Sequence, residues 1–132
     1  MKKRGILNGE LSKLVAEMGH MDMILIGDAG MPVPKGVKLI DLALVEGIPG
    51  FIEVLKAVLE DLKVEEAYID VELKSVSPHM KEKLDSVING EFKVTEIEHE
   101  KLKELSKDCK AAIRTGEFTP YSNIILKSGV VF

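Results

Sequence analysis

A histidine and an aspartate flank a short apolar segment near the start of the chain. His20 lies in Gly19-His20-Met21-Asp22, and Asp28 opens Asp28-Ala29-Gly30, on either side of the run Met23–Ile26. An imidazole exchanges its proton near neutral pH, and a carboxylate can orient that ring or bind a hydroxyl group. Polar side chains at the open ends of elements often carry function. We therefore expect this pair to lie close together at the mouth of the sheet and to perform acid–base chemistry.

Both residues also have a structural interpretation. His20 follows a predicted helix, and a helix C-terminus favours a protonated imidazole. Asp28 could hydrogen-bond its own backbone within the Asp-Ala-Gly turn. However, Asp28 follows a predicted strand, and ligands of open α/β sheets bind beyond the carboxyl ends of the strands. We favour a functional role for both.

Three more polar positions belong to a helix or to its first turn. His99 follows the strand predicted to end at Ile97, so its position repeats that of Asp28. A surface residue in the first turn of a polar helix is the alternative. Lys103 lies four residues on and shares the helical face of His99, although a lysine there is usually solvated. The third histidine, His79, begins a helix on its polar face, and we interpret it as a surface residue.

The segment Gly116–Asn123 combines a tight turn, a proline, an aromatic ring and an amide. Its last residues are Tyr121, Ser122 and Asn123, directly before an apolar strand. A flat ring and paired donor and acceptor groups suit the hydroxyls of a sugar. A turn with a satisfied asparagine explains the segment equally well.

Composition excludes several classes of partner. The 132 residues carry a net charge of −4 and show no basic stripe, so we expect no nucleic-acid partner. No apolar run approaches the length of a membrane span, and no apolar core follows Met1-Lys2-Lys3-Arg4 as in a signal peptide. The single Cys109 permits no internal disulfide, which is typical of the reducing cytoplasm.

We expect neither a metal nor an organic cofactor. Two histidines and an aspartate could ligate a metal, but they come from separate segments without H-x-x-H or H-E-x-x-H spacing. The chain also lacks a G-x-G-x-x-G pattern, a P-loop and a G-x-S-x-G elbow.

The elements that must position these residues alternate between helical and extended patterns. The apolar pattern predicts helices over 11–18, 51–62, 77–88 and 99–107, strands over 23–26, 67–73, 92–97, 111–113, 124–126 and 130–132, and a further short apolar segment over 40–44. Asn8 and Ser77 are the expected N-caps, while Gly19 and Asn89-Gly90 end two of the helices. The alternation predicts one α/β domain over residues 1–132, a three-layer α/β/α open sheet. It would be Rossmann-like in appearance but without a dinucleotide motif.

Short motifs along the whole chain resemble one family, that of ribose pyranases and fucose mutarotases. They keep the family's order and are Leu7-Asn8, Gly19-His20-x-Asp22, Asp28-Ala29-Gly30-x-Pro32-x-Pro34, Ile40-Asp41-x-Ala43-Leu44, Ile113-Arg114-Thr115-Gly116-Glu117, Pro120-Tyr121-x-Asn123-Ile124-Ile125-Leu126 and Ser128-Gly129-Val130. The Pro-x-Pro spacing is similar to the ribose branch rather than to the fucose branch.

This resemblance implies an isomerase that interconverts the pyranose and furanose forms of D-ribose by general acid–base ring opening and reclosure, upstream of ribose phosphorylation. It also implies a cytoplasmic, metal-free homodecamer. His20 matches the family's catalytic proton donor, and Asp28, His99 and Tyr121-Ser122-Asn123 match its sugar-binding positions. Ser122 stands where the family typically has alanine. Lys103 is a lesser candidate on the helix of His99.

Three questions stay open at this level. The chain could be a mutarotase of another sugar such as L-fucose, or a non-catalytic sugar-binding module. Asp28 could orient His20 or bind the sugar. The apolar residues Val130-Val131-Phe132 either help to build an assembly or complete an internal strand.

Overall fold

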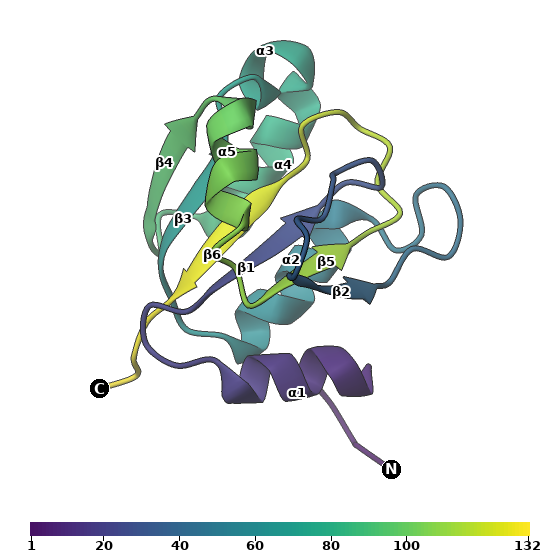
Figure 1. Ribbon diagram of the computed structural model, residues 1–132, viewed down its shortest axis with the longest axis vertical. Helices are drawn as coiled ribbons and strands as arrows, with labels where there is room; N and C mark the ends of the chain where they lie inside the picture. Colours follow the sequence, from purple (N-terminus) through teal and green to yellow (C-terminus); the bar gives the residue numbers. More distant parts are fainter.

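A computed structural model describes residues 1–132 as a six-stranded sheet with helices on both faces (Figure 1). The strands are β1 (Met23–Gly27), β2 (Lys38–Asp41), β3 (Val64–Asp70), β4 (Lys93–Ile97), β5 (Ala111–Arg114) and β6 (Ile124–Ser128), in the order β2-β5-β1-β6-β3-β4. All pairs are parallel except those of β6, which runs antiparallel to β1 and β3. The start of β6 therefore lies beside the carboxyl ends of β1 and β3.

Helices cover the two faces of the sheet unequally. The larger core cluster joins one face to α1 (Gly9–Glu17), α2 (Phe51–Asp61), α3 (Leu73–Val76) and α4 (Pro78–Ile88). The smaller cluster joins the other face to α5 (His99–Ser106) and to the loop after β1. The predicted three-layer α/β/α arrangement is confirmed.

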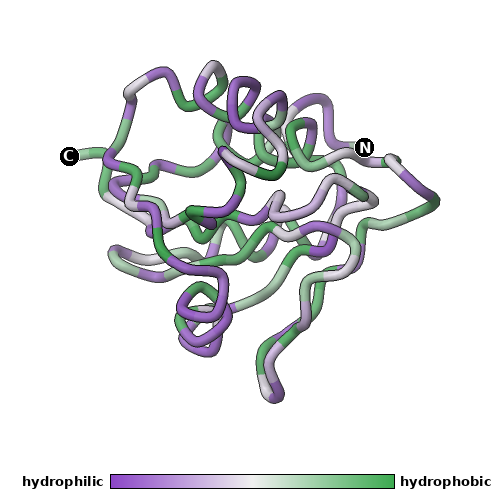
Figure 2. The backbone as a smooth tube through the Cα atoms, turned by 90° about the horizontal axis from the view of Figure 1, so that it is seen from above, coloured by the Kyte–Doolittle hydropathy of each residue, from purple (hydrophilic) through white to green (hydrophobic).

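The central strand β1 shows why its sequence is apolar without alternation. Ile24 and Ile26 pack in the larger cluster. Leu25, the residue between them in sequence, packs in the smaller cluster on the opposite face, which also contains Leu102 of α5. All three β1 side chains are buried, as expected for a strand covered on both faces. Figure 2 shows hydrophobic backbone segments within the layers and hydrophilic segments on the outer helices. Burial of each of the three β1 side chains stabilises the fold by about 1.5–3 kcal/mol.

Local hydrogen bonds set the helix ends. The side chain of Asn8 accepts a hydrogen bond from the backbone N–H of Leu11 at 2.9 Å, which confirms Asn8 as the N-cap of α1. Asn89 ends α4 in the left-handed conformation. Ser77 occupies the N-cap position of α4, but its hydroxyl donates to the carbonyl of Pro120 at 3.0 Å instead of capping the helix. This bond ties α4 to the segment that carries Tyr121 and Asn123.

Two predicted strands and one apolar segment differ from the structure. The strand predicted over 67–73 ends at Asp70, because the chain turns there into α3. The segment predicted over 40–44 pairs only as far as Asp41. Residues 130–132 form no strand, since pairing stops at Gly129, and Val131 and Phe132 are exposed.

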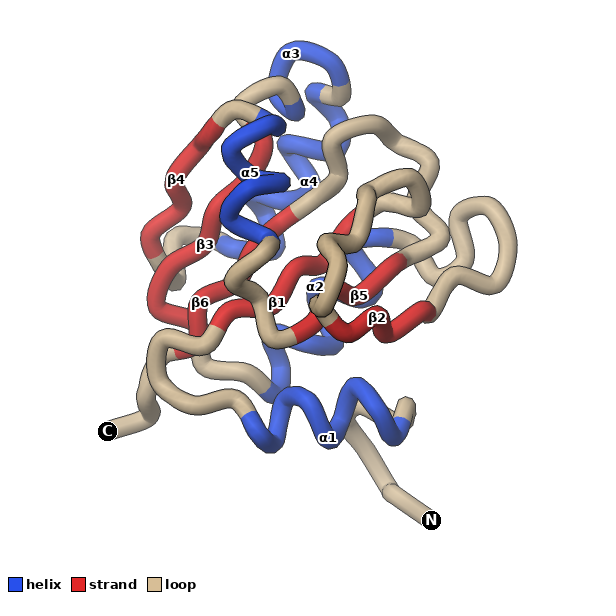
Figure 3. Tube along the Cα trace, in the orientation of Figure 1, coloured by secondary structure: helices blue, strands red, loops and turns tan.

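The connections after β1, β2 and β5 gather beyond one edge of the sheet (Figure 3). No helix has the length and apolar character that crossing a membrane requires.

Candidate active site

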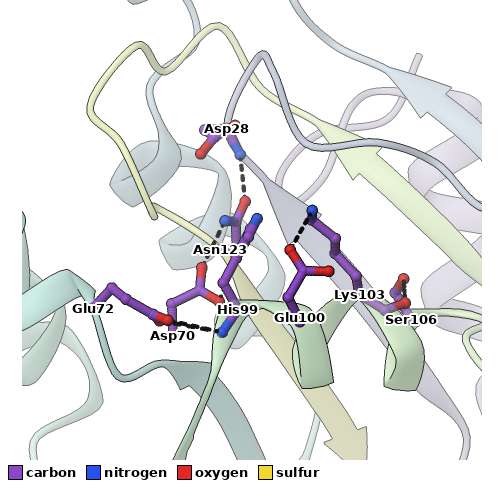
Figure 4. A network of polar contacts seen from close by, with 8 residues as sticks. All are labelled: Asp28, Asp70, Glu72, His99, Glu100, Lys103, Ser106 and Asn123. Atoms are coloured by element: carbon purple, nitrogen blue, oxygen red, sulfur yellow. Dashed lines mark hydrogen bonds and ion pairs between the residues drawn. The ribbon is translucent and has the colours of Figure 1, made fainter.

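Four polar residues meet at the carboxyl edge of the sheet (Figure 4). Asp28 follows β1, Asp70 ends β3, His99 begins α5 directly after β4, and Asn123 precedes β6. The antiparallel β6 brings Asn123 between the ends of its two neighbours, β1 and β3.

A chain of hydrogen bonds connects the four residues. The backbone N–H of Asp28 donates to Oδ1 of Asn123 at 3.0 Å, and Nδ2 of Asn123 donates to Oδ2 of Asp70 at 2.8 Å. The other oxygen of Asp70, Oδ1, lies 2.9 Å from Nδ1 of His99. Asn123 and Asp70 are buried, whereas His99 keeps 22% of its side chain exposed. The fold therefore brings together Asp28, His99 and Asn123, which the sequence analysis named as separate candidates.

Burial dominates the electrostatics of both carboxyl groups. It raises the pKa of Asp70, against the lowering effect of the hydrogen bonds from Asn123 and His99. Burial also raises the pKa of Asp28, opposed by the hydrogen bond from the backbone N–H of Gly30, and the charge of Asp70 raises it further. Two acidic groups with elevated pKa values at one strand edge are typical of a functional site.

The ring of Tyr121 packs against the hydrogen-bonded residues at the carboxyl edge, next to His99. Its ring meets that of His99 edge to face, with the ring centroids 5.2 Å apart. Its backbone is left-handed, with φ at 62°, and its carbonyl accepts from the N–H of Asn123 at 2.9 Å. Ser122 between them is buried, and its hydroxyl has no partner within the chain.

Neighbouring loops hold these segments in register. The hydroxyl of Thr115 donates to the carbonyl of Gly27 at 2.8 Å, and the backbone N–H of Ala29 donates to the carbonyl of Glu117 at 2.8 Å. A Cβ atom on Gly27 would lie 2.9 Å from Cβ of Met31 and 3.1 Å from Oδ1 of Asn123. The close approach of Asp28 to Asn123 therefore requires glycine at position 27.

Lys103 stands apart from the hydrogen-bonded chain. Its ammonium group pairs with Glu100 on its own helix, α5, at 2.9 Å. Figure 4 shows it on the same side of α5 as His99. Lys103 thus lines the rim of the site without holding any of its members.

His20 lies at the opposite edge of the sheet, so the expectation that it sits beside Asp28 was wrong for a single chain. Its Nε2 lies 3.0 Å from Oε2 of Glu65 at the start of β3, whereas Asp70 ends that strand. The five residues of β1 separate His20 from Asp28, and a strand rises roughly 3.3 Å per residue, which gives about 16 Å. Nearness in sequence failed as a guide because an extended strand moves the chain across the whole sheet.

The third histidine of the chain lies on the surface. His79 is exposed and lies 3.9 Å from Glu82 on the surface of α4, which confirms its interpretation as a surface residue. No cluster of three or more His, Cys, Asp or Glu side chains has metal-binding geometry. A hollow of about 780 Å³ between α2 and α4 contains none of the hydrogen-bonded residues.

Sequence reasoning missed Asp70. It follows the apolar residues of β3 as Asp28 follows those of β1, so the same argument could have found it. The strand was extended to Leu73, and this placed Asp70 inside the strand and hid its position at the edge.

Known proteins resemble this chain along its whole length. Residues 1–131 match the model of the RbsD / FucU transport protein family. A D-ribose pyranase of Clostridium perfringens is 55% identical over 132 residues, 100% of each chain, and one of Coprothermobacter proteolyticus is 50% identical over the same span.

Solved structures share the fold. Bacillus subtilis RbsD, solved in complex with D-ribose, superposes with a TM-score of 0.95 at 45% identity and covers 100% of both chains. The fucose mutarotase of Streptococcus pneumoniae, solved with L-fucose, has a TM-score of 0.81 at 29% identity and covers 96% of this chain and 95% of its own.

Proposed function

The chain belongs to the RbsD / FucU transport protein family, and we propose that it is an isomerase that interconverts the pyranose and furanose forms of D-ribose. The observation that carries this proposal is full-length similarity to proteins named D-ribose pyranase. The greater likeness to the ribose-bound structure than to the fucose-bound one favours ribose as the substrate.

The reaction needs two proton transfers. One group protonates the ring oxygen while another removes the proton of the anomeric hydroxyl, and reclosure through a different hydroxyl reverses these roles. Positioned acid–base groups contribute roughly 10²–10⁴-fold, which is sufficient for a reaction that aldoses already undergo slowly in water.

The carboxyl-edge residues are suited to hold the sugar. Asp28 keeps a carboxylate at the rim, and Tyr121 offers a ring face beside His99. Asn123 orients both Asp28 and Asp70 from within. We assign Asp28, His99 and the segment Tyr121-Ser122-Asn123 to sugar binding, with Lys103 as a secondary candidate on the rim.

His20 is the proposed proton donor, and it acts from a second copy of the chain. The sheet separates it from the Asp28 site of its own chain, so only a neighbouring subunit can bring the two together. Its side chain is 51% exposed and thus accessible to such a neighbour.

Exposed apolar side chains support assembly into a homo-oligomer, which the family resemblance makes a decamer. Leu44, Val45 and Phe118 line a shallow hollow of about 320 Å³ next to Arg114, close to the candidate site. Contiguous exposed apolar surface of this kind marks contact sites. Light scattering should give a mass many times 14.6 kDa, and a catalytically active monomer would contradict the assembly.

We further propose that the enzyme works in the cytoplasm, upstream of ribose phosphorylation, by supplying the furanose form to a kinase. A pyranase changes only the ring form of its sugar. Its product is therefore useful to an enzyme that accepts only one of the two ring forms.

Saturation-transfer NMR on equilibrated D-ribose tests the function. Catalytic amounts of protein should accelerate exchange between pyranose and furanose signals. Binding without faster exchange would indicate a sugar-binding module, and faster exchange only between anomers of L-fucose would indicate a mutarotase. Either result would contradict the proposal.

A further inference from the structure

The proposed reaction leaves one proton transfer without a residue. His20 supplies the proton to the ring oxygen, but a second group must accept the proton of the anomeric hydroxyl. Candidates at the carboxyl edge are the carboxylates of Asp28 and Asp70 and the imidazole of His99. Asp70 is buried and uses both oxygens for hydrogen bonds, so it cannot reach a sugar.

The hydrogen-bonded chain determines which nitrogen of His99 carries a proton. A backbone N–H can only donate, so the N–H of Asp28 requires Oδ1 of Asn123 to face it. The amide nitrogen of Asn123 must then face Asp70 and donate to it. The ionised Asp70 is an acceptor only, so its second oxygen requires a donor at Nδ1 of His99. Each assignment follows from the previous one, beginning at the backbone.

The outer nitrogen of His99 is left free by this arrangement. Nε2 makes no hydrogen bond within the chain, and the ring extends from α5 toward Asp28 (Figure 4). Neutral His99 with its proton on Nδ1 therefore presents a bare lone pair at Nε2 to the sugar site.

We propose that Asp70 is the positioning residue that fixes this tautomer of His99, and that Nε2 of His99 is the base that accepts the anomeric proton. The inference rests on the proposed function. Nε2 takes the proton, the O–H electron pair forms the carbonyl, and the bond from the anomeric carbon to the ring oxygen breaks. The ring oxygen keeps that bonding pair and takes the proton of His20. On reclosure His99 returns its proton to the carbonyl oxygen and the attacking hydroxyl gives its proton to His20, so atoms and charges balance over the cycle.

Charged groups around His99 come from every neighbouring segment. Asp70 belongs to β3, Asp28 to the loop after β1, and Glu72 to the turn before α3, where both its carboxylate oxygens accept from the backbone N–H of His99 at 3.2 Å. Glu100 and Lys103 pair with each other on α5. Asp70 is the one that hydrogen-bonds the ring, so its loss has a distinct effect.

Asp70→Asn tests this role because it keeps the shape of the side chain. Asn123 would still donate, so the single oxygen of the new amide would turn to Asn123 and its NH₂ group would face Nδ1 of His99. Nδ1 would then have to accept, and the proton would move to Nε2, where it blocks the base. The matched control is Glu72→Gln, which removes a charge beside His99 but retains an oxygen for the backbone N–H.

The experiment combines ¹⁵N NMR of the histidine rings with ribose exchange. We expect the unaltered chain and Glu72→Gln to carry the proton on Nδ1 of His99, and Asp70→Asn to carry it on Nε2. Pyranose–furanose exchange should fall about 100-fold or more in Asp70→Asn, with ribose affinity changed less than threefold (about 0.6 kcal/mol) and with Glu72→Gln near the unaltered rate.

Two results would overturn the inference. One is a proton on Nε2 in the unaltered chain, a measurement that does not depend on folding of any variant. The other is exchange by Asp70→Asn at the unaltered rate. Failure of the proposed function looks different, because the unaltered chain would then not accelerate exchange while His99 still carried its proton on Nδ1. That outcome would overturn the catalytic role of His99 and support only the positioning by Asp70.

Discussion

The two edges of the sheet hold the functional side chains in opposite ways. At the carboxyl edge, Asp28, Asp70, His99 and Asn123 are held by one another and largely removed from water. At the amino edge, the side chain of His20 is half-exposed and its one hydrogen-bonding partner is Glu65, at 3.0 Å. The proposed binding site at the first edge is preorganised, while the position of the proposed proton donor at the second depends on what covers it. Under the proposed function, one small chain thus carries both halves of the active site at opposite edges of its sheet.

Electrostatics show the same contrast. Burial raises the pKa of Asp28 at the carboxyl edge. At the amino edge, the backbone N–H of Gly19 and the ammonium group of Lys110, at 2.8 and 2.9 Å, lower the pKa of Asp22. The carboxyl edge thus holds carboxyl groups that are disfavoured by burial, whereas the amino edge holds a solvent-accessible carboxylate that is stabilised by a hydrogen bond and an ion pair.

The largest effect is expected from removing the exposed histidine. His20→Ala should reduce ribose exchange about 100-fold or more, because it removes the proposed proton donor. Its exposed pair with Glu65 contributes little to stability, so the free energy of unfolding should change by less than about 1 kcal/mol. NMR exchange rates and urea denaturation measure the two quantities. Near-normal exchange would show that the amino edge has no part in the chemistry.

An intermediate effect is expected from breaking the buried network. Asn123→Ala leaves the N–H of Asp28 and a carboxylate oxygen of Asp70 without partners, which should cost about 1–3 kcal/mol of stability. Because Asp28 and His99 then lose their fixed positions, ribose binding should also weaken clearly. Calorimetric titration with ribose measures this loss. Asn8→Ala is the matched control, since it also removes an asparagine oxygen from a backbone N–H. It should cost about 1 kcal/mol of stability and leave the affinity intact. Equal affinities for the two variants would contradict the assignment of Asn123.

The smallest effect is a difference in pH dependence between the two edges. The folded-state pKa of Asp28 is raised from 3.8, so its contribution to stability is present below that pH and is lost as pH rises through the folded value. Asp28→Asn should therefore gain stability relative to the unaltered chain on going from acidic to neutral pH. The folded-state pKa of Asp22 is lowered, so Asp22→Asn should lose relative stability over the same change.

Urea denaturation at fixed protein concentration and several pH values tests this pair. For each variant, the difference in free energy of unfolding from the unaltered chain is plotted against pH. The slopes for Asp28→Asn and Asp22→Asn should have opposite signs. Slopes of the same sign would mean that the edges do not differ as the structure indicates.

The fold was predictable from sequence to the extent that each element carries its own signal. The bounds of β1 and α1 were predicted to within a residue or two. Burial on both faces gives β1 a continuous apolar run, and Asn8 is a recognisable N-cap for α1. The end of β3 at Asp70 and the short α3 were not found, because apolar residues such as Leu73 continue past the turn into a different element.

The site was predictable only at one edge. Asp28 and His99 were identified because each follows the carboxyl end of a predicted strand, and Asn123 because its amide and the family resemblance point to sugar binding. His20 was misplaced relative to them because the sequence shows the length of β1 but not which edge its flanking residues occupy. Asp70 was not identified because the predicted strand extended three residues too far, to Leu73, and so placed Asp70 inside the strand.

Mixed oligomers of two inactive variants test the shared site most directly. His20→Ala retains the carboxyl edge, and His99→Ala retains the amino edge, so neither should exchange ribose alone. Subunits that are unfolded together and reassembled should regain activity, because about a quarter of the sites would combine two intact edges. We expect this recovery in the mixture, and none when either variant is reassembled alone. Mixed oligomers with no activity above that of the two parents would contradict it.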